Sequence, residues 1–183
     1  VHHILDSVTA DLGAHPSHRF IWSEIKWIEM WYPHQNISTQ NTFKRIIANS
    51  QFGFVGAGWS QHDEVTPSYR DMIQNTLTGH EYLRSILGNI GPNGACGIKR
   101  CIRFGWQIDM FAGYSATTPT LWSNAGYDGM VIRFEGPNDM RQEWNLQQNY
   151  EYLWEGSNLM NSNTTRIATH VIRWNYGDML LSN

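Results

Sequence analysis

The sequence predicts an α/β fold with a largely parallel sheet, of the kind that makes up a portion of a β/α barrel. Short apolar runs typical of strands alternate with segments in which apolar residues recur at helical spacing, as in βαβ units. The central apolar run, residues 102–108, is followed by one carboxylate, Asp109, and then by a loop of small residues. Ligands bind at the carboxyl ends of strands in such folds, so Asp109 is the first candidate functional residue.

Apolar spacing and helix-ending residues define the individual elements. Gly13 and Pro16 end the first helix, and Gly88 ends a long helix for which Thr66 is the expected cap and Pro67 suits the first turn. The expected helices cover residues 4–12, 27–32, 43–47, 66–87 and 118–125, with a further polar span at 137–148. The expected strands cover residues 20–25, 52–55, 102–108, 130–132, 150–154 and 167–172.

Composition limits the kinds of partner. The 183 residues are 41% hydrophobic and carry 13 basic against 16 acidic side chains, a net charge of -3 with no basic stripe for nucleic acid. No apolar run approaches the roughly 20 residues that span a bilayer. Because the chain opens on Val1 with a helical pattern already under way, we interpret residues 1–183 as an internal fragment of one domain of a longer protein, with no second domain.

Aromatic residues are abundant, with 9 Trp, 8 Tyr and 7 Phe. Aromatic rings pack on the C–H faces of sugars, but they also dominate ordinary hydrophobic cores, and both interpretations stay open. Cys96 and Cys101 suit a local disulfide if the protein is secreted. The N-glycosylation sequons at Asn36 and Asn163 favour the same route, so we expect the secretory pathway and a lysosomal, vacuolar or extracellular destination.

Residues 108–115 resemble a motif of glycoside hydrolase family 38, the class II α-mannosidases. Members of that family carry a strand ending in Ile-Asp-Pro-Phe-Gly-His-Ser, followed by a helix. Here the order is Ile-Asp-Met-Phe-Ala-Gly-Tyr-Ser, so that Met110 replaces proline, the loop is one residue longer, and Tyr114 stands where histidine is usual.

Two further stretches resemble the family in the same order and at compatible spacing. Residues 20–25 resemble its second strand, and residues 52–64, ending in Asp63 and Glu64, resemble its Gly-Gly-Trp and Asp-Glu signature. Together the three matches cover most of residues 1–135. The resemblance implies a glycoside hydrolase/deacetylase-like barrel and zinc-dependent hydrolysis of terminal α-mannosyl residues from oligosaccharides or N-glycans.

The resemblance also implies roles for individual residues. Asp109 would be both the catalytic nucleophile and a zinc ligand, Phe111 would line the sugar pocket, and Arg133 would steady the carboxylate by its charge. Zinc accepts carboxylate ligands and leaves positions open for substrate hydroxyls. A carboxylate nucleophile would form a glycosyl-enzyme intermediate, so the anomeric configuration would be retained.

Other parts of the family's site have no counterpart in this chain. His2 and His3 do not form its His-x-His-x-Asp pattern, and we interpret His170 as a structural residue or a neighbour of the substrate. Asp63 and Glu64 are adjacent, so on an extended segment they point to opposite faces and suit an orienting or helix-start role. We therefore expect this fragment alone to bind no zinc tightly and to hydrolyse nothing.

Two alternatives stay open from the sequence. One is a metal-dependent polysaccharide deacetylase, which would need an Asp-His-His ligand set that the sequence does not show. The other is a non-catalytic carbohydrate-binding module that relies on the tryptophans.

Overall fold

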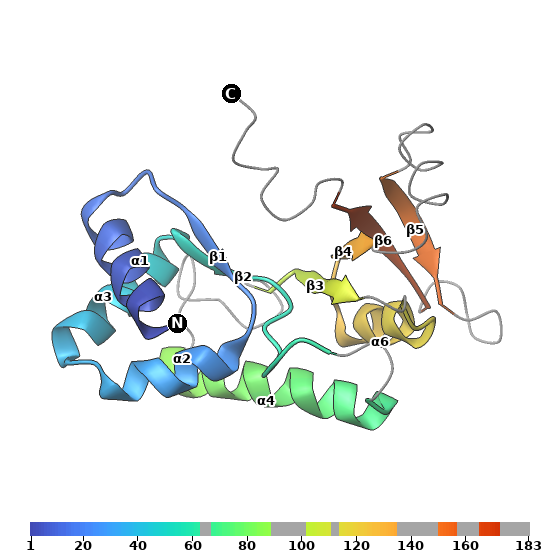
Figure 1. Cartoon of the computed structure of the whole chain (residues 1–183), viewed down its shortest axis with the longest axis horizontal. Coiled ribbons are helices and arrows are strands. Elements are labelled where there is room, and N and C mark those ends of the chain that lie inside the picture. Colours follow the sequence, from blue (N-terminus) through green and yellow to red (C-terminus); the bar gives the residue numbers. More distant parts are fainter. Residues whose placement is uncertain (63–66, 89–101, 111–113, 135–149, 157–164, 173–183) are drawn as a thin grey trace. The chain divides into compact units, whose positions relative to one another are not determined.

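The described part of the chain is a mixed α/β structure with two sheets (Figure 1). The computed structural model describes residues 1–62, 67–88, 102–110, 114–134, 150–156 and 165–172, without the side chains of residues 109, 110 and 134. The chain divides into two compact units, one of residues 1–62 and 68–105 and the other of residues 63–67 and 106–183.

Most of the helices that the structure describes lie in the first unit. Its elements are α1 (His2–Ala14), β1 (Phe20–Trp22), α2 (Ile25–Trp31), the short 3-10 helix η1 (Tyr32–His34), α3 (Ile37–Ala48), β2 (Phe52–Phe54) and α4 (Tyr69–Leu87). These confirm the predicted order, but the expected start of α4 is wrong, since the helix begins at Tyr69 and Pro67 precedes it instead of lying in its first turn. Ser68, not Thr66, caps this helix, because Ser68 and Asp71 form a reciprocal capping box.

Parallel pairing of β1 with β2 builds the core of the first unit. Phe20 lies opposite Phe52 and Trp22 opposite Phe54. The ring of Phe43 packs edge-on against Trp31 at 5.3 Å and against Phe52 at 5.2 Å between ring centroids. Burying each such side chain contributes about 1.5–3 kcal/mol. Trp31, Phe43, Phe52 and Phe54 are buried and therefore belong to the core.

The second unit contains most of a four-stranded sheet with strand order β3-β4-β6-β5. Its elements are β3 (Phe104–Met110), which begins in the last residues of the first unit, α6 (Thr117–Ala125), β4 (Gly129–Phe134), β5 (Glu151–Glu155) and β6 (Arg166–Val171). Helix α6 packs against β5 and β6 (Figure 1). Alternate residues of β6, namely Ile167, Thr169 and Val171, are buried.

The prediction of a parallel sheet is confirmed in part. Strands β1 and β2 are parallel, as are β4 and β6, but β5 runs antiparallel to β6. Residues 156–165 join β5 to β6, and this connection is shorter than the dozen or more residues that a parallel crossover needs. Closure into a barrel stays a prediction. Within the described ranges, no helix is long and apolar enough to cross a bilayer.

Candidate functional site

Asp109 lies within β3, as its next-to-last residue. The strand therefore runs slightly further than the apolar pattern predicts, since Asp109 and Met110 still belong to it. Gln107, two residues earlier, is buried with 1% exposure. The backbone position agrees with a carboxylate near the end of a strand, while the direction of the Asp109 side chain stays a prediction.

Tyr114 joins β3 to β4 through its hydroxyl group. The Tyr114 oxygen accepts a hydrogen bond from the main-chain N–H of Arg133 at 3.0 Å. The hydroxyl group has one hydrogen to donate, and two main-chain oxygens can accept it. One is the oxygen of Gln107, 3.2 Å from the Tyr114 oxygen, and the other is that of Arg133. The ring packs edge-on against Trp154 at 6.0 Å between centroids. Tyr114 thus fixes the spacing of two neighbouring strands close to Asp109.

Arg133 is the fifth residue of β4 and is buried, with 7% exposure. Its main chain is tied to β3 through Tyr114, so the predicted nucleophile and the predicted cation belong to two strands joined at this point. A buried guanidinium group differs from the exposed salt-bridge partner that a strand-end arginine often is. The sequence predicts a site role for Arg133 but none for Tyr114. The one feature of the sequence that marks Tyr114 is that it stands where the family usually has histidine.

Glu24 fixes the end of β1 in the first unit. One carboxylate oxygen accepts the main-chain N–H of Gln61 at 3.0 Å, and the other accepts the indole N–H of Trp27 at 3.0 Å. The main-chain oxygen of Glu24 accepts the indole N–H of Trp22 at 2.7 Å. The carboxylate is therefore used to join the start of α2 to the segment that follows β2.

The turn after β2 packs closely on helix α4. Gly56 and Ala57 have positive φ angles of 61° and 51°. A Cβ atom placed on Gly79 of α4 would lie 2.2 Å from the main-chain oxygen of Ala57. Gly79 is therefore the residue of α4 that allows this turn to approach the helix closely, and the spacing of residues along the sequence does not identify it.

Asn75 of α4 organises the residues that follow this turn. Its side-chain oxygen accepts the Ser60 N–H at 3.0 Å, and its amide nitrogen donates to the Ser60 main-chain oxygen at 2.7 Å. The same nitrogen donates to Nδ1 of His62 at 3.2 Å. Burial lowers the pKa of His62 to about 4, so the ring is neutral at pH 7 and can accept this bond.

Several predicted residues lie outside the described residues. They are Asp63, Glu64, Cys96, Cys101 and Phe111. The orienting role of the acidic pair, the local disulfide and the sugar contact of Phe111 therefore stay predictions. His170 is described, and its Nδ1 lies 3.3 Å from a carboxylate oxygen of Glu151 on β5, with its side chain 51% exposed. This pairing of two exposed residues agrees with a structural role.

Zinc is an expectation from the family resemblance, and Asp109 is the one ligand predicted for it in this chain. Asp109 is a carboxylate, a ligand type that zinc accepts, and it lies near the end of β3. Among the residues whose side chains the structure describes, potential metal ligands gather in a group of three only at Asp11, His15 and His18. That group lies at the end of α1 and involves none of the predicted site residues. Asp109 therefore stays a predicted ligand, and the family's other ligands have no assigned counterpart among the described residues.

Residues 1–180 match the family described as the N-terminal domain of glycosyl hydrolases family 38. Alpha-mannosidase C of Dictyostelium discoideum is 34% identical over 185 residues, which cover 94% of this chain and 16% of that protein. Alpha-mannosidase D of the same organism is 30% identical over 177 residues, covering 96% of this chain and 13% of that protein. The chain thus spans less than a fifth of the length of these relatives.

Solved structures show the same fold. An alpha-mannosidase from Enterococcus faecalis superimposes with a TM-score of 0.65 at 16% identity, over 92% of this chain and 17% of that one. A 4-alpha-glucanotransferase from Thermococcus litoralis gives a TM-score of 0.60 at 11% identity, over 94% of this chain and 25% of that one. At such low identity the likeness concerns the fold alone.

Proposed function

The chain belongs to glycosyl hydrolase family 38, matching its N-terminal domain, and on that premise we propose that the protein is an α-mannosidase. Its substrates would be oligosaccharides or N-glycans that carry terminal α-mannosyl residues. The observation that carries the proposal is the position of Asp109 near the end of β3, inside the matched region. The α-mannosidase names of the relatives support the same activity.

Asp109 is proposed as the nucleophile of a retaining hydrolysis. Its carboxylate attacks the anomeric carbon while the glycosidic oxygen leaves with a proton from a general acid. Water then hydrolyses the mannosyl ester on Asp109, and the mannose is released with its original configuration. Phe111 would contact the sugar ring. Tyr114 would keep β3 and β4 at the spacing that this attack needs, since its hydroxyl contacts both strands.

Asp109 would also supply a carboxylate oxygen to a zinc ion. When bound, zinc supplies Lewis-acid polarisation and an attachment point for sugar hydroxyls. Arg133 would hold the same carboxylate in its ionised form by charge, because a nearby cation favours that form.

The nucleophile assignment is tested with the full-length protein and an aryl α-mannoside. Asp109→Asn should lower kcat by at least about a thousandfold, because no other group replaces the attacking oxygen. The matched control is Glu155→Gln, which removes the exposed carboxylate that ends β5 and should leave kcat unchanged. Full activity of Asp109→Ala would overturn the assignment.

Two further measurements separate the chemical classes. An activated 2-fluoromannoside should label the peptide that contains Asp109, and NMR should detect the α-anomer of mannose as the first product. A deacetylase would instead release acetate, and a carbohydrate-binding module would bind mannosides without cleaving them.

A secretory route is proposed from the sequons. Asn36 is exposed and caps α3, with its side-chain oxygen accepting the Thr39 N–H at 3.0 Å. That contact uses the oxygen and not the amide nitrogen to which a glycan is attached. Treatment with a peptide N-glycosidase should reduce the mass of the secreted protein, and Asn36→Gln should remove part of that change. An unmodified Asn36 in protein from the native source would count against this route.

A further inference from the structure

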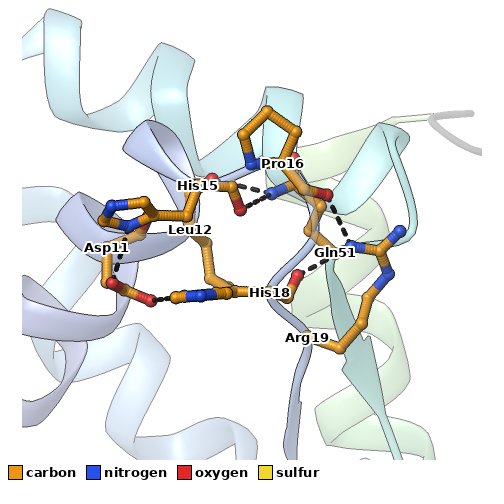
Figure 2. A network of polar contacts seen from close by, with 7 residues as sticks. All are labelled: Asp11, Leu12, His15, Pro16, His18, Arg19 and Gln51. Atoms are coloured by element: carbon orange, nitrogen blue, oxygen red, sulfur yellow. Dashed lines mark hydrogen bonds and ion pairs between the residues drawn. The ribbon is translucent and has the colours of Figure 1, made fainter.

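An aspartate and two histidines meet at the end of α1 (Figure 2). One carboxylate oxygen of Asp11 lies 2.9 Å from Nδ1 of His15, and the other lies 2.8 Å from Nδ1 of His18. The two imidazole rings are stacked, with centroids 4.7 Å apart. One potential ligand atom from each residue lies within 4.8 Å of the other two. We refer to these three residues as the Asp11 cluster.

The main chain that carries the Asp11 cluster is held in place from β2. The buried side chain of Gln51, next to the start of β2, donates from Nε2 to the main-chain oxygen of Leu12 at 2.7 Å and to that of His15 at 3.2 Å. His15 ends α1, and its N–H donates to the Asp11 main-chain oxygen at 2.9 Å. The main chain of Leu12 and His15 is therefore held in place without a bound ligand.

Arg19 holds the other side of the turn. Its Nη1 donates to the main-chain oxygen of Pro16 at 2.7 Å and to that of His18 at 2.8 Å (Figure 2). These bonds direct the guanidinium group to carbonyl oxygens of the turn. They also fix the backbone of His18, so all three members of the cluster start from defined positions.

The donor types are those that a transition-metal ion takes, and each Nδ1 lies 2.9 or 2.8 Å from a carboxylate oxygen of Asp11. Zinc binds imidazole nitrogen and carboxylate oxygen at about 2.0–2.2 Å, which places neighbouring ligand atoms about 3 Å apart. The side chains are 47–56% exposed, so an ion can reach them directly from solvent.

We propose that Asp11, His15 and His18 form a surface binding site for a divalent transition-metal ion. The ion takes the place of the hydrogens that the imidazoles now share with the carboxylate. Each neutral ring then carries its hydrogen on Nε2 and coordinates through Nδ1, and water completes the coordination. None of the three residues takes part in the proposed hydrolysis, so this site is independent of Asp109.

The test uses Zn²⁺ and the full-length protein, with readouts that do not involve activity. Equilibrium dialysis counts the bound zinc, and anomalous scattering at the zinc absorption edge locates it in crystals. We expect an anomalous peak between the three side chains, and one zinc fewer per chain in His15→Gln/His18→Gln. Asp11→Asn removes a charged ligand and should weaken this binding at least about tenfold, since loss of even an outer partner of a metal ligand has that effect.

The matched control is His2→Gln/His3→Gln, which removes two exposed histidines from the opposite end of the same helix. It should leave the zinc count unchanged. Circular dichroism of each variant checks that α1 remains folded. The proposal is overturned if no peak appears at the cluster with Zn²⁺ at about 1 mM, or if the two double variants bind equal amounts of zinc.

Discussion

The main-chain N–H of Arg133 donates a hydrogen bond of 3.0 Å to the hydroxyl oxygen of Tyr114. That hydroxyl also contacts the main-chain oxygen of Gln107, so one side chain from the loop after β3 bonds to both β3 and β4. Family 38 sequences resembling this stretch usually have histidine at the position of Tyr114. The contact gives this variant residue a structural task next to the proposed nucleophile.

Tyr114→Phe tests this contact. It removes the oxygen and leaves the Arg133 N–H without that acceptor, so the free energy of unfolding should fall by about 1–3 kcal/mol. Urea denaturation measures the change. The control is Tyr69→Phe, whose side chain is 54% exposed and should shift stability by less than about 0.5 kcal/mol. Equal stability of the two variants would show that the Tyr114 hydroxyl does not hold the strands together.

Gly79→Ala should destabilise the protein strongly. The added methyl group would lie 2.2 Å from the Ala57 main-chain oxygen, so α4 or the turn at residues 56–59 must move. Overpacking of this kind costs about 1–3 kcal/mol or more. Gly53→Ala is the matched control, since its Cβ atom would lie 3.9 Å from the nearest atom, in Ile21. Thermal melting should show a clear loss for the first variant and little change for the second.

The buried ring of His62 makes stability depend on pH. Burial lowers its pKa in the folded protein from 6.5 to about 4, so the unfolded chain binds more protons between these values. The free energy of unfolding should therefore fall as the pH drops from about 6.5 to about 4, by up to about 3 kcal/mol. His80, whose pKa burial also lowers, acts in the same direction.

Urea denaturation at several pH values measures this dependence. His62→Gln should flatten the slope between about pH 6.5 and pH 4, whereas His34→Gln, at an exposed position in η1, should leave it unchanged. An unaltered slope in His62→Gln would assign the acid sensitivity to other groups.

Local chemistry explains which elements the sequence predicted correctly. Helix α6 ends at Gly126, with a φ angle of 90°, as the sequence predicts, whereas α3 is predicted only over residues 43–47 and in fact begins at Ile37, where Asn36 caps it. Such signals need no information from elsewhere in the chain. The antiparallel direction of β5 depends on the length of the connection to β6. The spacing of apolar residues does not predict whether two strands pair parallel or antiparallel.

Contacts between distant residues explain what the sequence did not show. Tyr114 acts through the main-chain N–H of Arg133, and Gly79 allows close approach of the main-chain oxygen of Ala57. The spacing of apolar residues along the sequence does not predict either contact. The Asp11 cluster likewise depends on a contact that the spacing of residues does not predict. His15 and Asp11 are at helical spacing, but His18 joins them only because the turn after α1 brings it back. Asp109, by contrast, was identified from its strand and from family resemblance.

Arg133 is proposed to act on the carboxyl group of Asp109 through its positive charge. A nearby cation favours the ionised form of a carboxyl group, so Arg133→Met should move the acidic limb of the kcat/KM profile of the full-length protein to higher pH, by about one unit. Arg133→Lys should restore most of this shift, because it keeps the charge. Arg166→Met removes an exposed cation from β6 and serves as the control. If Arg133→Met lowers activity equally at every pH, or if Arg133→Lys fails to restore the limb, then the buried guanidinium supports the fold of β4 without tuning the nucleophile.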